Sequence, residues 1–111
     1  MGQLIHIQQQ DFSVDDAYKA MRDAYGSEVG GIASFVGLVR DRNAKAGDGG
    51  KVQTLTLEHY PGMTEKSIEK ILGHAEERWP LLGCHVIHRV GTMAPSEQIV
   101  LVMVASAHRD A

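Results

Sequence analysis

The sequence of 111 residues contains a single cysteine, Cys84, and only 5% aromatic residues. One cysteine excludes an internal disulfide and a zinc site built from several cysteines of one chain. No apolar run approaches the roughly 20 residues that a membrane-spanning helix needs. The N-terminus lacks a basic segment followed by an apolar stretch, so a secretory signal is not predicted. These absences together predict a soluble, cytoplasmic protein.

Positive charge is also scarce, because 11 Lys and Arg residues against 14 Asp and Glu residues give a formal net charge of −3. A protein that follows nucleic acid normally carries a broad basic face and aromatic side chains for base stacking. Neither is present, which argues against nucleic acid as a partner. An anion site in this protein would have to be a local cluster of positive charge. The length and the 43% of hydrophobic residues predict one domain over residues 1–111.

Apolar periodicity predicts two helices and five strands. The first helix should lie between Ser13 as N-cap and Gly26 as C-cap, and the second between Thr64 as N-cap and Pro80. The strands are expected over residues 4–7, 29–39, 52–59, 84–90 and 98–106. The last strand is apolar on both faces, which is typical of a central strand. Glycines in the second strand indicate a bulge or the close approach of another backbone.

These elements predict an α+β fold in which two helices pack on one face of a mostly antiparallel or mixed sheet. In the second helix, a buried stripe is expected at helical spacing. Its members are Ile68, Ile71, Leu72, Ala75 and Trp79.

Histidine and cysteine offer little support for a metal site or a nucleophile. His85 and His88 are three residues apart on a predicted strand, so they point to opposite faces and cannot share a metal. Carboxylates at ligand spacing are not found either, and we expect no metal site. Cys84 is in phase with Val86 and Val90, which favours a packing role over a nucleophilic one.

A basic cluster is the stronger candidate for a site. Arg40 and Arg42 follow one predicted strand, and His108 and Arg109 follow the last one. Guanidinium groups bind phosphate and carboxylate oxygens in pairs, and histidine can move a proton near neutral pH. The alternative is two unrelated solvated ends with their own counter-ions. Spacing alone favours neither interpretation.

Several motifs resemble one family closely. They are Phe35-Val-Gly-Leu-Val-Arg40, Leu57-Glu-His-Tyr-Pro-Gly-Met-Thr64, Arg78-Trp-Pro80, Val86-Ile-His-Arg-Val-Gly91 and Ser106-Ala-His-Arg109. In this order they resemble the catalytic, or large, subunits of molybdopterin synthases. The resemblance implies an α/β hammerhead-type fold and a homodimer of large subunits. A small ubiquitin-like sulfur-carrier subunit at each end would complete a heterotetramer.

The resemblance also implies an activity. The carrier's C-terminal thiocarboxylate would pass sulfur, in two rounds, to cyclic pyranopterin monophosphate and so form the dithiolene of molybdopterin. Molybdenum is inserted later by other enzymes, so no metal or cofactor is implied. A non-catalytic dimeric platform that binds the carrier's tail is the alternative function.

The same resemblance assigns substrate-binding residues. Leu38, Val39 and Arg40 match one substrate-binding stretch of the family, and His108 with Arg109 match a second, which converges with the first across the dimer interface. The family's catalytic lysines belong to a segment that follows the Ser-Ala-His-Arg motif. The 111 residues do not include that segment, so no catalytic residue is assigned.

Overall fold

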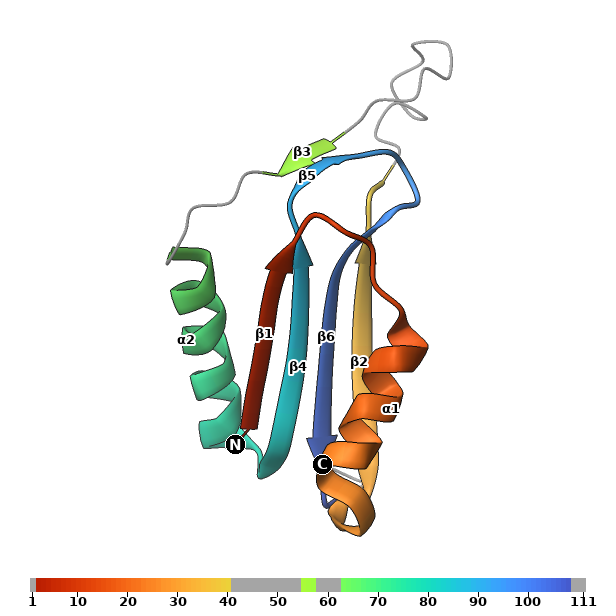
Figure 1. Ribbon diagram of the computed structural model, residues 1–111. Coiled ribbons are helices and arrows are strands. Elements are labelled where there is room, and N and C mark those ends of the chain that lie inside the picture. The colour runs from red at the N-terminus through yellow and green to blue at the C-terminus, as the bar shows by residue number, and fades with distance from the viewer. Residues whose placement is uncertain (1, 41–54, 58–62, 109–111) are drawn as a thin grey trace.

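A four-stranded sheet with one helix on each face forms the body of the protein, and a two-stranded sheet extends one end (Figure 1). The computed structural model describes residues 2–40, 55–57 and 63–108. The elements are β1 (Gly2–Gln8), α1 (Val14–Tyr25), β2 (Gly31–Leu38), β3 (Leu55–Leu57), α2 (Met63–Arg78), β4 (Leu81–Arg89), β5 (Gly91–Met93) and β6 (Gln98–Ser106), with a 3₁₀ turn at Gly26–Glu28.

The larger sheet is mixed and has the strand order β1-β4-β6-β2. β1 runs parallel to β4, whereas β6 pairs antiparallel with both β4 and β2. β6 is therefore an inner strand, and Leu101 and Ala105 on it are completely buried. The predicted α+β class, with two helices on a mixed sheet, is confirmed.

The first helix follows its sequence signals closely. Ser13 caps α1 by accepting a hydrogen bond from the Asp16 backbone N–H at 3.2 Å. Gly26 ends the helix with a positive φ of 54°, a conformation that glycine adopts without strain. Ala17 and Met21 are buried against the sheet, as the predicted apolar face requires.

The two helices cover opposite faces of the sheet, so the prediction that both lie on one face is wrong. α1 packs on the face that carries Ile87, Leu101 and Met103. On the other face, Leu72 of α2 packs against Cys84 and Val86. Successive residues of a strand point to opposite sides, and the inner strands are apolar on both. Each face therefore needs its own cover.

The second helix differs from its prediction in two ways. It begins at Met63, which places Thr64 inside the helix rather than at the N-cap. Within the expected stripe Leu72 is buried, but Ile71 and Trp79 are 67% and 46% exposed. α2 lies beside β1 at the edge of the sheet (Figure 1), so its apolar stripe is wider than the surface that it covers.

A short strand that the sequence did not predict, β5, pairs with β3 in the small sheet. Of the predicted strand 52–59 the structure describes only Leu55–Leu57; its other residues, like Arg42, lie outside the described residues. The glycine prediction for the second strand is confirmed. The pairing of β2 with β6 shifts register between Gly37 and Leu38, and a Cβ on Gly30 would collide with the carbonyl oxygen of Ala107. No helix in the described part of the chain is long and apolar enough to span a membrane.

Leu101 is the residue through which the core can be tested. We expect Leu101→Ala to lower the free energy of unfolding by about 3 kcal/mol, because a fully buried leucine leaves a cavity on truncation. Ile71→Ala, at an exposed position of α2, should change it by less than about 0.5 kcal/mol. Urea denaturation of both variants measures the difference. Equal losses would contradict the assignment of the core.

Candidate functional site

The first group of predicted site residues lies where β2 ends. Leu38 is 51% exposed and Arg40 is exposed, so both side chains are available to a ligand. Val39 between them is buried. Its N–H donates to the Glu97 carbonyl and its carbonyl accepts from the Ser96 N–H, both at 2.9 Å. Val39 thus fixes the path of the chain on either side of it.

The second group lies where β6 ends. Ser106 is buried and donates a hydrogen bond through Oγ to the Pro80 carbonyl at 3.3 Å. The same oxygen accepts from the backbone N–H of His108 at 3.1 Å, which directs the chain as it leaves the strand. The His108 side chain is exposed. Arg109 lies outside the described residues.

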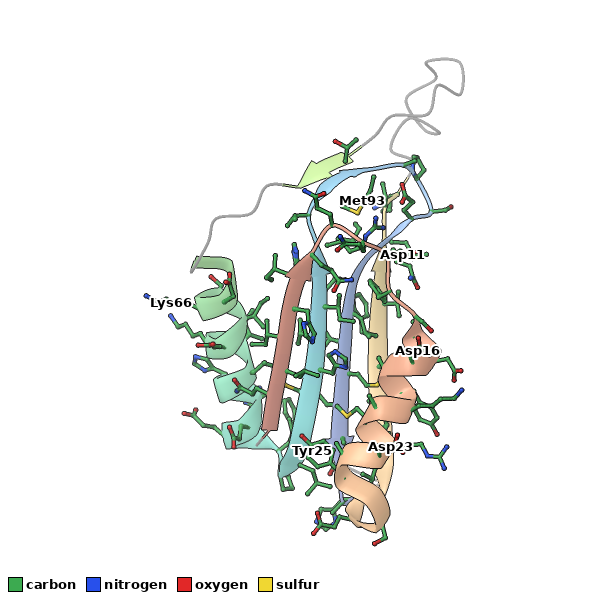
Figure 2. All side chains as sticks on the ribbon, viewed as in Figure 1. Asp11, Asp16, Asp23, Tyr25, Lys66 and Met93 are labelled. Carbon is green, nitrogen blue, oxygen red and sulfur yellow. The ribbon has the colours of Figure 1, made fainter. Side chains whose placement is uncertain are left out.

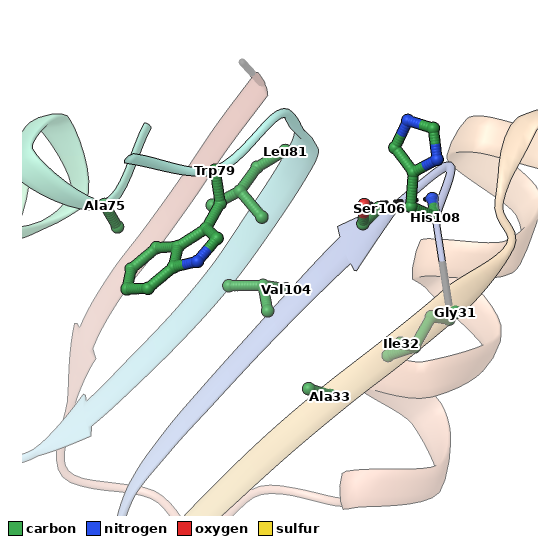
Figure 3. Close-up of a pocket in the computed structure, with 9 residues that line it drawn as sticks. All are labelled: Gly31, Ile32, Ala33, Ala75, Trp79, Leu81, Val104, Ser106 and His108. Carbon is green, nitrogen blue, oxygen red and sulfur yellow. Dashed lines mark hydrogen bonds between the residues drawn. The ribbon is translucent and has the colours of Figure 1, made fainter. Parts of the chain in front are cut away.

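A pocket of about 320 Å³ lies beside His108. It is lined by Gly31, Ile32, Ala33, Ala75, Trp79, Leu81, Val104, Ser106 and His108. Trp79, from just beyond α2, and His108, from just beyond β6, stand on opposite sides of it (Figure 3). Apart from Ser106, the other walls are aliphatic or glycine, so the pocket suits a slim apolar or extended backbone segment with a polar group at the His108 side.

Arg40 and His108 do not meet within one chain. The antiparallel register pairs Gly31 with Ser106 at one end and Leu38 with Gln98 at the other. Strands rise by about 3.4 Å per residue, so the two candidate groups are separated by roughly 25 Å. The two candidate groups therefore lie at opposite ends of the β2–β6 pair, and each would be half of a shared site.

The remaining candidates from the sequence are Cys84 as a nucleophile and a metal site, and the structure supports neither among the described residues. Cys84 is 2% exposed; burial raises the pKa of its thiol, while a hydrogen bond from the Leu4 backbone partly opposes this. A low pKa is what a nucleophilic cysteine needs, so the packing role is favoured. Among the described residues, no three His, Cys, Asp or Glu side chains are grouped closely enough to hold a metal ion.

Arg89 is a functional candidate that the sequence pattern did not single out. It is only 7% exposed. Because arginine is almost never buried unless it is paired, its partners are informative. Its Nε donates to the Gln9 carbonyl at 3.0 Å and one terminal nitrogen donates to the Gln98 carbonyl at 2.9 Å. The available signal was its phase, since Arg89 shares a face of β4 with the buried Ile87.

Comparisons with known proteins identify the family. The MoaE protein family matches residues 7–111 of this sequence. The chain belongs to the MoaE protein family. A molybdopterin synthase catalytic subunit from Vibrio cholerae is 51% identical over 111 residues, which cover all of this chain and 70% of that protein. Another from Ralstonia nicotianae is 49% identical over 105 residues, covering 95% of this chain and 57% of the relative.

Solved structures of the MoaE family share the fold. A molybdopterin biosynthesis MoaE protein from Burkholderia ambifaria has a TM-score of 0.82 at 42% identity, with 99% of this chain and 67% of that chain covered. A complex of subunits 1 and 2 of molybdopterin-converting factor from Helicobacter pylori aligns at a TM-score of 0.70 with 19% identity, over 95% of this chain and 66% of that chain, and shows the fold alone. This MoaE-family chain spans 70% of the length of the Vibrio protein and 57% of the length of the Ralstonia protein.

A buried histidine is expected to make the stability of this MoaE-family chain depend on pH. His85 is 8% exposed, and its ring lies edge-to-face with His6 at a centroid distance of 5.5 Å. Burial lowers the pKa of His85 below its ordinary value, and the neighbouring His6 lowers it further. Its Nε2 is buried without a hydrogen-bond partner.

The native state therefore binds a proton at His85 less readily than the unfolded chain does. The contribution of neutral His85 to stability is fully present above the unfolded pKa of about 6.5. It should be lost as the pH falls from there through the lower native pKa. We expect the free energy of unfolding to decrease between pH 7.5 and pH 5, and His85→Leu to flatten that decrease. His74→Gln, on the exposed side of α2, serves as the control and should leave the pH dependence unchanged. An equal slope in wild type and His85→Leu would refute this account.

Proposed function

We propose that this protein is the catalytic subunit of a molybdopterin synthase and transfers sulfur from a small ubiquitin-like carrier subunit to cyclic pyranopterin monophosphate. The observation that carries the proposal is the 51% identity to a molybdopterin synthase catalytic subunit over the whole length of this chain. The domain assignment over residues 1–111 is part of the same proposal. We further propose a cytoplasmic location, where a reducing environment would preserve both the carrier's thiocarboxylate and the free thiol of Cys84.

The proposed active unit is a homodimer, because only a second copy can complete the site. β2 is an edge strand of the sheet, and Phe35 and Leu38 on it are 63% and 51% exposed. A twofold axis near the middle of β2 would set the two copies of this strand antiparallel to each other. The Arg40 end of one copy then lies against the His108 end of its partner, which unites the two half-sites twice in each dimer.

The chemistry of the united site suits an anionic substrate. Arg40, with Arg109, would hold the phosphate of the pterin through paired hydrogen bonds. His108 would orient or protonate an oxygen on the pterin side chain. In each round the carrier's carbon–sulfur bond breaks, and on the pterin side chain a carbon–sulfur bond forms as a carbon–oxygen bond breaks. The displaced oxygen leaves as water or, where the cyclic phosphate ester opens, stays on the phosphate. Oxygen from water takes the place of sulfur on the carrier, which leaves as a carboxylate.

The pocket beside His108 is the proposed entry for the carrier's tail. Gly31, Ala33 and Ala75 leave room for an extended Gly-Gly segment, and the exposed Trp79 can cover it from one side. The proposal of a partner subunit rests on the Vibrio cholerae relative, which is named as one subunit, the catalytic one, of molybdopterin synthase. Carrier binding without any product would instead favour the non-catalytic platform.

Trp79 provides a direct measurement of tail binding because it is the protein's single tryptophan. A synthetic peptide ending in Gly-Gly should change the Trp79 emission in a saturable manner. Ala75→Leu fills the pocket and should weaken binding about tenfold or more. A peptide ending in Gly-Leu is the control for tail shape. Unaltered affinity in Ala75→Leu would remove the pocket from the proposal.

Mixing two inactive variants tests the shared site. Arg40→Ala and His108→Ala should each lower sulfur transfer strongly as homodimers. Co-expressed in equal amounts, they should recover about a quarter of wild-type activity, because half of the dimers are mixed and each of these has one intact site. Molybdopterin formation from thiocarboxylated carrier and precursor is the assay.

The matched control pairs Arg40→Ala with the double variant that carries both substitutions. No mixed dimer then contains an intact site, and activity should stay at the level of the single variants. If neither the Arg40→Ala/His108→Ala mixture nor the control mixture regains activity, each site draws Arg40 and His108 from one chain, contrary to the proposal.

A further inference from the structure

Four side chains at one end of the sheet form a connected group around a buried cation. We refer to Asp11, Arg89, Glu97 and Gln98 as the Arg89 clasp. Arg89 lies at the end of β4, Gln98 begins β6, and Asp11 lies in the connection between β1 and α1. Figure 2 shows Asp11 at the same end of the sheet as Met93 of β5. The clasp thus joins segments that are distant in the sequence.

The contacts within the clasp are specific and mostly charge-assisted. One terminal nitrogen of Arg89 lies 3.4 Å from Glu97 Oε1 and 3.9 Å from Asp11 Oδ1. Gln98 Nε2 donates to Asp11 Oδ1 and to the Phe12 carbonyl, each at 2.8 Å. Because the guanidinium is a rigid, planar donor, these partners fix its orientation, and the two carboxylates also balance its positive charge.

Glu97 connects Arg89 to the turn that precedes β6. Its Oε2 accepts a hydrogen bond from the Ala94 backbone N–H at 2.6 Å, and its own N–H donates to the Ala94 carbonyl at 3.1 Å. Ser96 in this turn has a φ of 74°, in the left-handed region that non-glycine residues rarely adopt. A turn with such a conformation is held by its surroundings, and the carboxylate of Glu97 bridges it to Arg89.

The same turn holds the residue before Arg40. Both backbone polar groups of Val39 pair with it, one with the Glu97 carbonyl and one with the Ser96 N–H. The Val39 side chain is 5% exposed, so packing fixes this residue as well. Arg40 follows directly, with its side chain exposed and its backbone position set by Val39.

We propose that the Arg89 clasp is a positioning device that holds Arg40 in place for the anionic substrate, through Glu97, the turn at Ser96 and the backbone of Val39. This inference rests on the proposed function, in which Arg40 binds the pterin phosphate. Arg89 itself is a positioning residue and does not touch substrate. Its burial keeps its charge directed at Glu97 and Asp11 rather than at solvent.

Glu97→Gln is the variant that tests the clasp. It keeps the volume of the side chain and an oxygen for the Ala94 N–H, but it removes the negative charge facing Arg89. Asp15→Asn is the matched control, because it removes the carboxylate of an exposed ion pair with Lys19 on α1, 3.1 Å long, away from the clasp. Thermal unfolding of each variant establishes that it is folded before it is assayed.

Two measurements are made on these variants and on Arg40→Ala. Amide hydrogen exchange at Val39, followed by NMR, reports the clasp without any need for activity. We expect exchange at this N–H to be about tenfold faster in Glu97→Gln and unchanged in Asp15→Asn. In sulfur transfer with the thiocarboxylated carrier, we expect Glu97→Gln to raise KM for the pterin precursor about tenfold, with kcat within about twofold.

The double variant Arg40→Ala/Glu97→Gln separates positioning from a general structural effect. If the clasp acts through Arg40, Glu97→Gln adds less than about twofold to KM once Arg40 is absent. Equal effects of Glu97→Gln with and without Arg40, or unaltered exchange at Val39, would overturn the inference. A third outcome is faster Val39 exchange in Glu97→Gln together with an unaltered KM in Arg40→Ala. That result would refute the role of Arg40 in the proposed function, and with it this inference.

Discussion

The antiparallel pairing of β2 with β6 is the constraint on which the candidate site depends. Its register, from Gly31 opposite Ser106 to Leu38 opposite Gln98, fixes where each end of β2 lies. Arg40 therefore lies beside the turn that leads into β6, and His108 lies where β6 ends. The same pairing brings Gly30 against the carbonyl of Ala107, an approach that only a residue without a Cβ allows. A different register would separate Val39 from its partners Ser96 and Glu97.

The inner position of β4 and β6 explains why the helices lie on opposite faces. Both strands present apolar side chains alternately to each side, so neither face can be left entirely to solvent. α1 covers one face over β4 and β6. α2 covers the β1–β4 half of the other, which leaves Phe35 on β2 exposed on that side. The pocket beside His108 lies at the boundary between the covered and the open half.

Much of the local structure was predictable because its causes are local. The cap at Ser13, the end of α1 at Gly26 and the irregularity in β2 all follow from properties of neighbouring residues. The burial of Ile71 and Trp79 was predicted wrongly for the opposite reason. Helical spacing states which residues share a face, but the width of the surface that covers that face is set by the strands opposite. The start of α2 at Met63 also shows that a capping residue type does not by itself fix a boundary.

Sequence patterns alone were enough to predict the two helices, the central strand, the motifs of the MoaE family and the residue types of the candidate site. Periodicity and motif spacing depend on neighbouring positions, so they can be recognised in the amino-acid sequence. The folded structure was needed to show that Arg40 and His108 lie at opposite ends of one strand pair. It was also needed to show that Arg89 is buried beside the turn that holds Val39. Those relations depend on hydrogen bonds between strands far apart in the sequence. Pairing and register, rather than composition, determine which distant residues meet.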